Sequence, residues 1–345
     1  MSPSTMQAIR MTAPTKAEVQ TVPLPKLRDD YVLVKVEAVA LNPTDWKHIK
    51  WLSKPGNTIG CDYAGTVVEV GSKVTKAWKK GDRIAGFTHG GNEVENEDGC
   101  FAEYCVAKGD LQMKIPDNLS FTEAATLGVG VTTVGQALCQ SLGLPLPTEP
   151  TKEQTPLLIY GGSTATGVLA IQYAKLAGLK VIVTCSPHNF DFVKSLGADA
   201  AFDYKSPDCA KQIREYTNDS LTHVFDTISE GDSPKISAEA ISSKGGVISY
   251  LLPAKSPRED VEDKQTLGYT VVGEYFKFGP MEFQPIPENF EFGKMWWALS
   301  EKLFAEGKVK VHKTEVREGG IPAIFGGLKD LEDGKVSGKK LVYTI

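Results

Sequence analysis

The chain has 345 residues, of which 41% are hydrophobic and 23% are charged, and these values are typical of a globular protein of about two domains. A net charge of −5 and the lack of a long basic tract argue against a nucleic-acid-binding protein. No apolar run approaches the roughly 20 residues of a membrane span, and the N-terminus has no hydrophobic signal region, so we expect a cytoplasmic protein.

The six cysteines are scattered along the chain and form no C-x-x-C pair. This spacing indicates neither a disulfide framework nor a zinc ribbon. We therefore expect reduced thiols.

The first third of the chain is rich in β-strand signals. Residues 31–41 are an extended run of β-branched positions, and residues 63–87 alternate apolar and polar positions between glycine turns. Residues 121–143 then have helical spacing, with Ser120 or Thr122 as the N-cap. Residues 144–156 are dominated by proline and polar residues and are predicted to form a loop.

From Leu157 onwards, apolar strands alternate with helical segments. The predicted strands are residues 157–160, 180–185, 223–228, 245–251 and 270–276. Fully apolar strands are typical of a parallel sheet buried on both faces. An amphipathic helix over 289–309, ended by Gly307, and a β-like tail over 335–345 follow. This order predicts an α/β fold in which a domain over 126–279 is inserted into a β-rich domain made of 1–125 and 280–345.

The turn at residues 161–167 lies between an apolar strand and a helix. It contains Gly161, Gly162 and Gly167, although the dinucleotide-binding fingerprint G-x-G-x-x-G is broken. Glycines at a helix N-terminus present free N–H groups to phosphate. The hydroxyl groups of nearby Ser and Thr residues add donors, so we expect this turn to bind a dinucleotide.

The end of the second strand predicts which dinucleotide is bound. NAD sites usually place a carboxylate there to bind the ribose, whereas this chain has Cys185 and Ser186. Ser186 and His188 are candidate donors to a 2′-phosphate, Tyr204 is a candidate to flank the adenosine, and Lys205 adds positive charge nearby. We therefore expect NADPH. The alternative is that these residues do not bind the cofactor, and that the serine caps a helix and the tyrosine lies on the surface.

Motifs along nearly the whole chain resemble the medium-chain dehydrogenase/reductases. They are VALNPTDWKH, GCDYAGTVVEVG, KKGDRIAGF, GGSTATG and SGKKLVY. The resemblance implies a GroES-like catalytic domain and a Rossmann domain, with a cleft between them where nicotinamide meets substrate. Three motifs, NPTDWKH, YGGSTATG and GEYFKFGP, look most like fungal trans-acting enoyl reductases, which serve polyketide synthases.

The resemblance also implies an enzyme without zinc. Zinc-dependent members have a cysteine where this chain has Asn42, a His-Glu pair at Cys61-Asp62, and another cysteine near Val129. A catalytic zinc needs three protein ligands, and only Cys61 and Asp62 are candidates here. The four-cysteine lobe of a structural zinc is also missing, because only Cys100 and Cys105 lie in that region.

The site residues follow from the same resemblance. Lys47 is the candidate catalytic group, because its ammonium would stabilise an enolate oxygen; the alternative is a surface lysine beside Lys50. His48 is expected to be structural rather than acidic. The expected cofactor-binding residues are Asp45, Trp46, Lys47, His48, Gly162, Ser163, Thr164, Ala165, Thr166, Cys185, Ser186, His188, Tyr204, Leu251, Leu252, Val336 and Ser337. The expected substrate-contacting residues are Leu127, Val131, Thr132, Gly273, Glu274, Tyr275, Phe276 and Phe278, and core packing or a dimer edge is the alternative for each aromatic ring.

The sequence thus predicts NADPH-dependent reduction of the double bond of an α,β-unsaturated thioester on the acyl-carrier domain of a polyketide synthase. The alternatives are a quinone or small-enone reductase and a non-catalytic NADPH-binding protein. We expect a monomer rather than a homodimer. An acidic carrier needs a basic docking patch on this acidic chain. Two clusters are candidates: Lys73, Lys76, Lys79 and Lys80, or Lys308, Lys310, Lys313 and Arg317.

Overall fold

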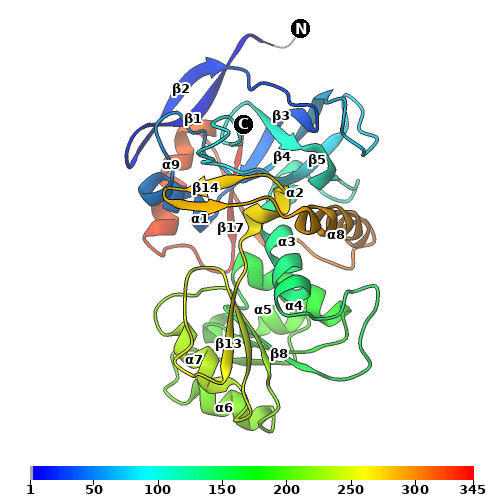
Figure 1. The fold of residues 1–345 in the computed structure, drawn as a ribbon, viewed down its shortest axis with the longest axis vertical. Coiled ribbons are helices and arrows are strands. Elements are labelled where there is room, and N and C mark those ends of the chain that lie inside the picture. Colours follow the sequence, from blue (N-terminus) through cyan, green and yellow to red (C-terminus); the bar gives the residue numbers. More distant parts are fainter. Residues whose placement is uncertain (1–2) are drawn as a thin grey trace. The chain divides into compact units, whose positions relative to one another are not determined.

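The computed structural model describes residues 3–345, in which the chain forms two compact units (Figure 1). The first unit contains the chain up to Thr132 and Tyr269–Ile345, and the second is Thr133–Gly268. The predicted inserted domain, 126–279, extends beyond the second unit at both ends. The flanking segments pack within the first unit: Tyr269 and Phe276, for example, pack against the ring of His89.

A seven-stranded sheet organises the first unit, in the order β16-β17-β3-β4-β5-β7, with β6 also paired to β3. Its strands are β3 (Tyr31–Ala40), β4 (Asp62–Val70), β5 (Arg83–Phe87), β6 (Tyr104–Lys108), β7 (Gln112–Lys114), β16 (Thr314–Arg317) and β17 (Lys340–Thr344). Two hairpins accompany it, β1 (Thr5–Ala13) with β2 (Lys16–Pro23) and β14 (Phe276–Phe278) with β15 (Met281–Phe283). The helices are α1 (Pro43–Lys47), α2 (Phe121–Ala124), α3 (Gly128–Gly135), α8 (Pro287–Ala305) and α9 (Gly320–Glu332).

The predicted β signals of the first third are confirmed. Residues 31–41 form β3, residues 63–87 contain most of β4 and all of β5, and the tail forms β17. Alternate side chains of β3 and β4 enter one buried core, which also receives Ile324 and Leu328 from α9. Burial of this apolar face holds the sheet together.

The single helix expected over 121–143 is wrong, because the segment is divided into α2, α3 and a π-helical turn at Gln136–Ser141. Ser120 is the N-cap of α2, and its hydroxyl accepts from the Glu123 amide at 3.2 Å. The Thr126 hydroxyl donates to the Glu123 carbonyl at 2.6 Å. This side-chain bond competes with helix continuation, so α2 ends at Ala124 and α3 starts at Gly128.

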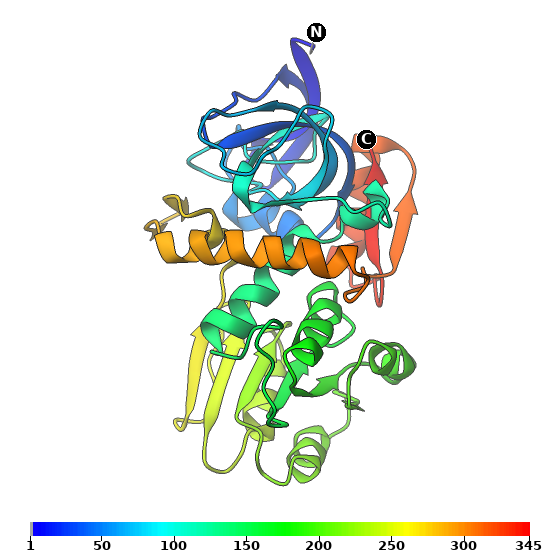
Figure 2. The same cartoon turned by 90° about the vertical axis from the view of Figure 1, so that its right-hand side faces the viewer.

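An entirely parallel six-stranded sheet forms the centre of the second unit, in the order β10-β9-β8-β11-β12-β13. The strands are β8 (Pro156–Tyr160), β9 (Lys180–Thr184), β10 (Ala200–Phe202), β11 (His223–Asp226), β12 (Gly246–Tyr250) and β13 (Val261–Gln265). The helices are α4 (Ala165–Leu176), α5 (Phe190–Ser195), α6 (Cys209–Tyr216) and α7 (Ser233–Ala240). The chain moves outwards from β8 in one direction and from β11 in the other, so the right-handed crossovers of parallel strands are expected to place α4 and α7 on opposite faces. Figure 2 shows the strands of this sheet side by side.

The strand predicted over 270–276 is wrong. These residues form a 3₁₀ turn at Gly268–Val272 and the first residue of β14, and both belong to the first unit. The sixth strand of the parallel sheet is β13, whose sequence VEDKQ is almost entirely polar. Because β13 is an edge strand with mostly exposed side chains, it carries no apolar signal.

The long helix α8 was predicted correctly, and it ends at Ala305 with Gly307 just beyond it at φ 65°. Its buried residues, which include Gly293, Trp296, Trp297 and Ser300, recur at helical spacing and explain the predicted amphipathic pattern. Within residues 3–345, no helix combines the length and the apolarity that crossing a membrane requires.

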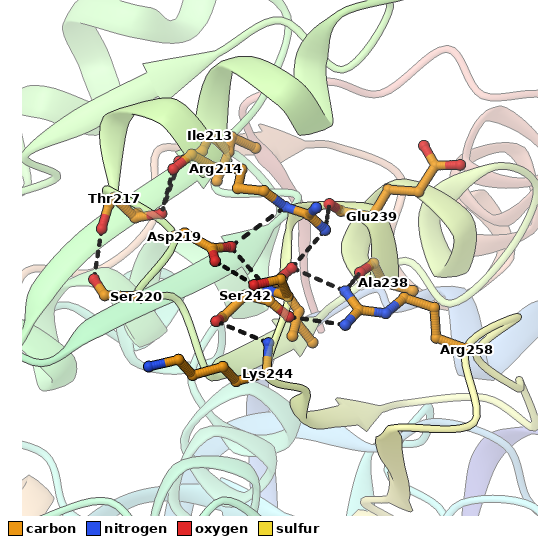
Figure 3. Close-up of polar contacts among 12 residues, drawn as sticks. Ile213, Arg214, Thr217, Asp219, Ser220, Ala238, Glu239, Ser242, Lys244 and Arg258 are labelled. Atoms are coloured by element: carbon orange, nitrogen blue, oxygen red, sulfur yellow. Dashed lines mark hydrogen bonds and ion pairs between the residues drawn. The ribbon is translucent and has the colours of Figure 1, made fainter.

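Two arginines of the second unit donate hydrogen bonds to main-chain carbonyls at the carboxyl end of α7 (Figure 3). Arg258 donates to the carbonyls of Ala238, Ile241 and Ser242 at 2.8–2.9 Å and to Asp260 at 2.6–2.9 Å. Arg214 donates to the Glu239 and Ile241 carbonyls at 2.6 and 2.7 Å. These bonds replace the partners that the last carbonyls of a helix lack.

Candidate functional site

The turn between β8 and α4 has the backbone that phosphate binding requires. Gly161 has φ +88°, and an added Cβ would lie 2.5 Å from the Thr227 hydroxyl. A Cβ on Gly167 would lie 2.3 Å from the Gly161 carbonyl oxygen, so α4 approaches the strand as closely as glycine allows. The Thr164 hydroxyl caps the helix by accepting from the Gly167 amide at 2.9 Å. The amides of Ala165 and Thr166 belong to the first turn of α4, where backbone N–H groups lack intrahelical acceptors and can bind an anion.

The predicted cofactor residues of the second unit lie together at the carboxyl ends of the strands of its sheet. They follow the carboxyl ends of four parallel strands: residues 162–166 follow β8, 185–188 follow β9, Tyr204 follows β10 and Leu251–Leu252 follow β12. The strand order reverses between β8 and β11, and dinucleotides bind at such reversals. The rings of Tyr160 and Tyr204 are 6.3 Å apart at these strand ends.

Residues 185–188 provide no carboxylate. Burial raises the pKa of the Cys185 thiol to about 11, so the thiol is neutral at physiological pH. Ser186 is half-buried and His188 is exposed, which leaves both available at the end of β9. The residues present therefore fit a nicotinamide dinucleotide, and none of them carries a charge that would repel a phosphate.

Sequence reasoning missed Asp226, the last residue of β11. It is fully buried, and its Oδ1 accepts from the amides of Ile228 and Ser229 at 2.9 and 2.8 Å. Ser229, with φ 57°, accepts in turn from the Leu251 amide at 2.8 Å. Asp226 thus shapes the loop beside the glycine turn, and the one sequence signal for it was an acid within an apolar strand.

In the first unit, α1 carries the candidate catalytic residue. Asn42 is the N-cap of α1, and the backbone amide of Asn42 donates to the Asp45 carboxylate at 2.7 Å. Burial raises the pKa of Asp45 to about 7. Lys47 is half-buried, and its ammonium lies 5.6 Å from the centre of the Trp46 ring.

His48 is held within the core next to a tyrosine that sequence reasoning missed. The hydroxyl of Tyr269 lies 3.0 Å from His48 Nε2, 2.7 Å from Thr44 Oγ1 and 3.6 Å from Cys61 Sγ. Burial lowers the pKa of His48 to about 4, so the ring is neutral at physiological pH. No local pattern marks Tyr269, because it lies more than 200 residues from its partners in the sequence.

The predicted substrate residues fall in two places within the first unit. Leu127, Val131 and Thr132 are buried at α3, and the Thr132 hydroxyl has no hydrogen-bond partner within residues 3–345. Phe276 and Phe278 are buried in the hairpin β14–β15, where their ring centroids are 5.3 Å apart.

The neighbours of these hairpin rings take different positions. Tyr275 is half-buried. Gly273 has φ +69°, and an added Cβ there would lie 2.8 Å from the Phe290 side chain, so this position favours glycine. The Glu274 carboxylate accepts from Lys108 and from the Tyr31 hydroxyl at 2.5 and 2.9 Å, so it anchors the segment to β3 and β6. On the tail before β17, Val336 is half-buried and Ser337 is exposed.

The positions of the zinc ligands in zinc-dependent relatives are filled by a lysine-centred cluster. The buried Lys340 ammonium donates to Asn42 Oδ1 at 2.9 Å, to the Thr126 carbonyl at 3.1 Å and to the Asp62 carboxylate. Burial raises the pKa of the Cys61 thiol well above its usual range, so it stays protonated. In the part of the chain that the structure describes, no three His, Cys, Asp or Glu side chains are grouped to hold a metal ion. This donor set does not fit a catalytic zinc.

The two lysine clusters expected to dock a carrier are largely engaged in internal ion pairs. In the first cluster, Lys73 pairs with Asp29, and Lys76 pairs with Glu301. In the second, Lys308 pairs with Glu306, and Arg317 pairs with Glu315 and Asp330. Three members, Lys79, Lys80 and Lys313, form no ion pair within the described residues.

Comparison with known proteins gives the same fold. The family model of the alcohol dehydrogenase GroES-like domain matches residues 28–117, and that of the zinc-binding dehydrogenases matches residues 165–280. The chain is similar to the crystal structure of an alcohol dehydrogenase superfamily protein from Novosphingobium aromaticivorans, with a TM-score of 0.80, 22% identity and 99% coverage of both chains.

Two curated relatives match nearly the whole chain. The trans-enoyl reductase ACTTS2 of Alternaria alternata is 51% identical over 99% of both chains. The trans-enoyl reductase resD of Aspergillus sclerotiorum is 47% identical over 99% of this chain and 100% of its own length. The chain therefore belongs to the fungal trans-enoyl reductases of the medium-chain dehydrogenase/reductase superfamily.

Proposed function

We propose that this protein is a trans-acting enoyl reductase that uses NADPH to reduce the α,β-double bond of an acyl thioester carried by a partner polyketide synthase. One observation carries the proposal: relatives named trans-enoyl reductases are 51% and 47% identical over 99% of this chain. The glycine turn before α4, which fits a dinucleotide phosphate, supports it from the chemistry of the site.

NADPH, when bound, supplies the hydride for the β-carbon of the substrate. The protein's task is to stabilise the negative charge that then develops on the thioester oxygen. Lys47 is the group proposed for this task, because an ammonium close to an enolate oxygen stabilises it without a metal ion. His48 is neutral and buried, so it does not serve as the acid that protonates the α-carbon.

NADPH is preferred over NADH in this proposal. The support is the chemistry at the end of β9, where a half-buried serine and an exposed histidine take the place of the carboxylate that binds the NAD ribose. A carboxylate at this position would repel a 2′-phosphate, whereas a hydroxyl group donates to it.

We also propose that catalysis is independent of zinc. The support is electrostatic, since a divalent cation next to the Lys340 ammonium would be repelled and would have to displace it from Asn42 and Asp62. We expect purified protein to contain substoichiometric zinc by metal analysis, and chelation to leave turnover unchanged. Loss of activity on chelation, with recovery on adding zinc, would contradict this part of the proposal.

Docking of an acidic acyl-carrier domain is proposed to involve Lys79 and Lys80, because the other lysines of their cluster are neutralised by internal ion pairs. The partner is expected to be the polyketide synthase that presents the thioester, and the protein is expected to be a monomer. These expectations rest on the resemblance and on charge complementarity.

Turnover with three acceptors tests the reaction. We compare an enoyl-pantetheine thioester, the same enoyl group on a carrier domain, and a benzoquinone at matched concentration, following NADPH consumption. We expect reduction of both thioesters, faster for the carrier-bound one, and poor turnover of the quinone. Faster turnover of the quinone than of either thioester would assign the protein to the quinone reductases instead.

A further inference from the structure

A buried ammonium lies where three elements of the first unit meet. The side chain of Lys340, at the start of β17, is 2% exposed, and that of its partner Asp62 is 0% exposed. The ammonium has three donors and three oxygen acceptors, on Asn42, Thr126 and Asp62. Its hydrogen-bonding capacity is therefore fully used, which is what burial of a charge requires.

Two of the three acceptors lie at the beginnings of helices that carry candidate site residues. Asn42 is the N-cap of α1, which carries Lys47. The Thr126 carbonyl lies just before α3, which carries Val131 and Thr132. The second oxygen of Asp62 accepts from the Val129 amide in α3 at 2.5 Å, so the ion pair joins both helices to β4 and β17.

Close packing leaves no room for a side chain at Gly128, the first residue of α3. An added Cβ on Gly128 would lie 2.3 Å from the Gly86 carbonyl oxygen and 2.5 Å from Asp62 Oδ1. The start of α3 therefore lies directly against the carboxylate that holds Lys340. A shift of either charged group would displace this helix start.

Stability alone does not explain such a pair. Burying an ammonium and a carboxylate costs several kcal/mol in desolvation, and well-packed apolar side chains often replace such a pair without loss of stability. The gain from a fully bonded pair is a fixed geometry. We propose that Lys340 is a positioning residue that fixes the starts of α1 and α3, and hence the places of Lys47 and Thr132, for the enoyl reduction. The functional part of this inference rests on the function proposed above.

The test separates geometry from stability with the double variant Lys340→Met/Asp62→Leu, which removes both charges. Lys339→Met is the matched control, since this adjacent lysine is 35% exposed and pairs with Glu315. We expect the double variant to unfold near the wild-type temperature but to lose at least about tenfold in kcat, because misplacement by about an ångström costs that much or more. Wild-type kcat in a stably folded double variant would overturn the proposal.

Amide hydrogen exchange gives a second readout, which needs neither substrate nor cofactor. The variant Asn42→Ser keeps the Lys340–Asp62 pair and an N-cap oxygen for α1, but it shortens the side chain that accepts from Lys340. We expect faster exchange at residues 44–48 and unchanged exchange at residues 129–132, where Asp62 still holds α3. Unchanged exchange at residues 44–48 would overturn the positioning role. If the wild type did not reduce enoyl thioesters, the proposed function would be wrong. The exchange experiment would still test whether Lys340 fixes the start of α1.

Discussion

Asp45 is a buried carboxyl group whose proton affects stability. Burial raises its pKa from 3.8 to about 7 in the folded protein, so between these values the unfolded chain has released a proton that the folded protein keeps. Across this window, the Asp45 contribution lowers the free energy of unfolding by about 1.4 kcal/mol for each pH unit of rise. Above about pH 7 both states are ionised and the contribution becomes constant.

The variant Asp45→Asn removes this titration and keeps an oxygen that accepts from the Asn42 amide. We expect the variant to gain stability relative to the wild type as the pH rises from about 5 to about 7, which urea unfolding of both proteins at each pH measures. Other titrating groups, including His48, are present in both proteins and cancel. An equal difference in unfolding free energy at both pH values would contradict the raised pKa.

Ser186 is the residue on which the cofactor prediction depends. The variant Ser186→Asp places a carboxylate at the end of β9, where it would repel a 2′-phosphate and accept from a ribose hydroxyl. We expect the dissociation constant of NADPH to rise at least about tenfold and that of NADH to fall, as fluorescence titration measures. Ser195→Asp, on the exposed end of α5, is the charge-matched control. Tighter binding of NADH than of NADPH by the wild type would contradict the assignment.

At the scale of elements, Arg258 stabilises the end of α7 and the loop after it. All five guanidinium N–H groups are accommodated by three main-chain carbonyls and Asp260, a geometry that a lysine cannot reproduce. We expect Arg258→Lys to lower the free energy of unfolding of the second unit by about 1–3 kcal/mol, measured by denaturant unfolding. Lys244→Ala, an exposed change nearby, is the control, and equal midpoints for both variants would contradict this role.

Apolar patterns predicted the buried elements and failed where burial and strand formation do not coincide. The runs that became β3, β8, β9 and β12 were recognised because strands buried in a core carry a concentration of apolar residues. Residues 270–276 also contain apolar side chains, but they form a 3₁₀ turn and the start of the hairpin β14–β15. The polar strand β13 was missed because an edge strand is held by main-chain bonds to β12 rather than by apolar side chains.

At the scale of the whole molecule, the order of elements and the family motifs were enough to predict a GroES-like unit with a Rossmann unit inserted. The glycine turn was also predictable, because its residues are contiguous in sequence. The contacts that organise the first unit were not: Lys340 and Asp62 are 278 positions apart, and Tyr269 and His48 are 221 apart. Such pairs have no local signature, since they form only when distant strands and helices have packed.

The central claim is that hydride passes from NADPH to the β-carbon of an enoyl thioester. The most direct measurement uses NADPH deuterated at C4 of the nicotinamide on the transferred face, a carrier-bound enoyl thioester, and mass spectrometry with NMR of the product. We expect a saturated thioester with one deuterium at the β-carbon and none at the α-carbon, which takes its hydrogen from water. An unreduced thioester, or deuterium at any other position, would contradict the proposed function.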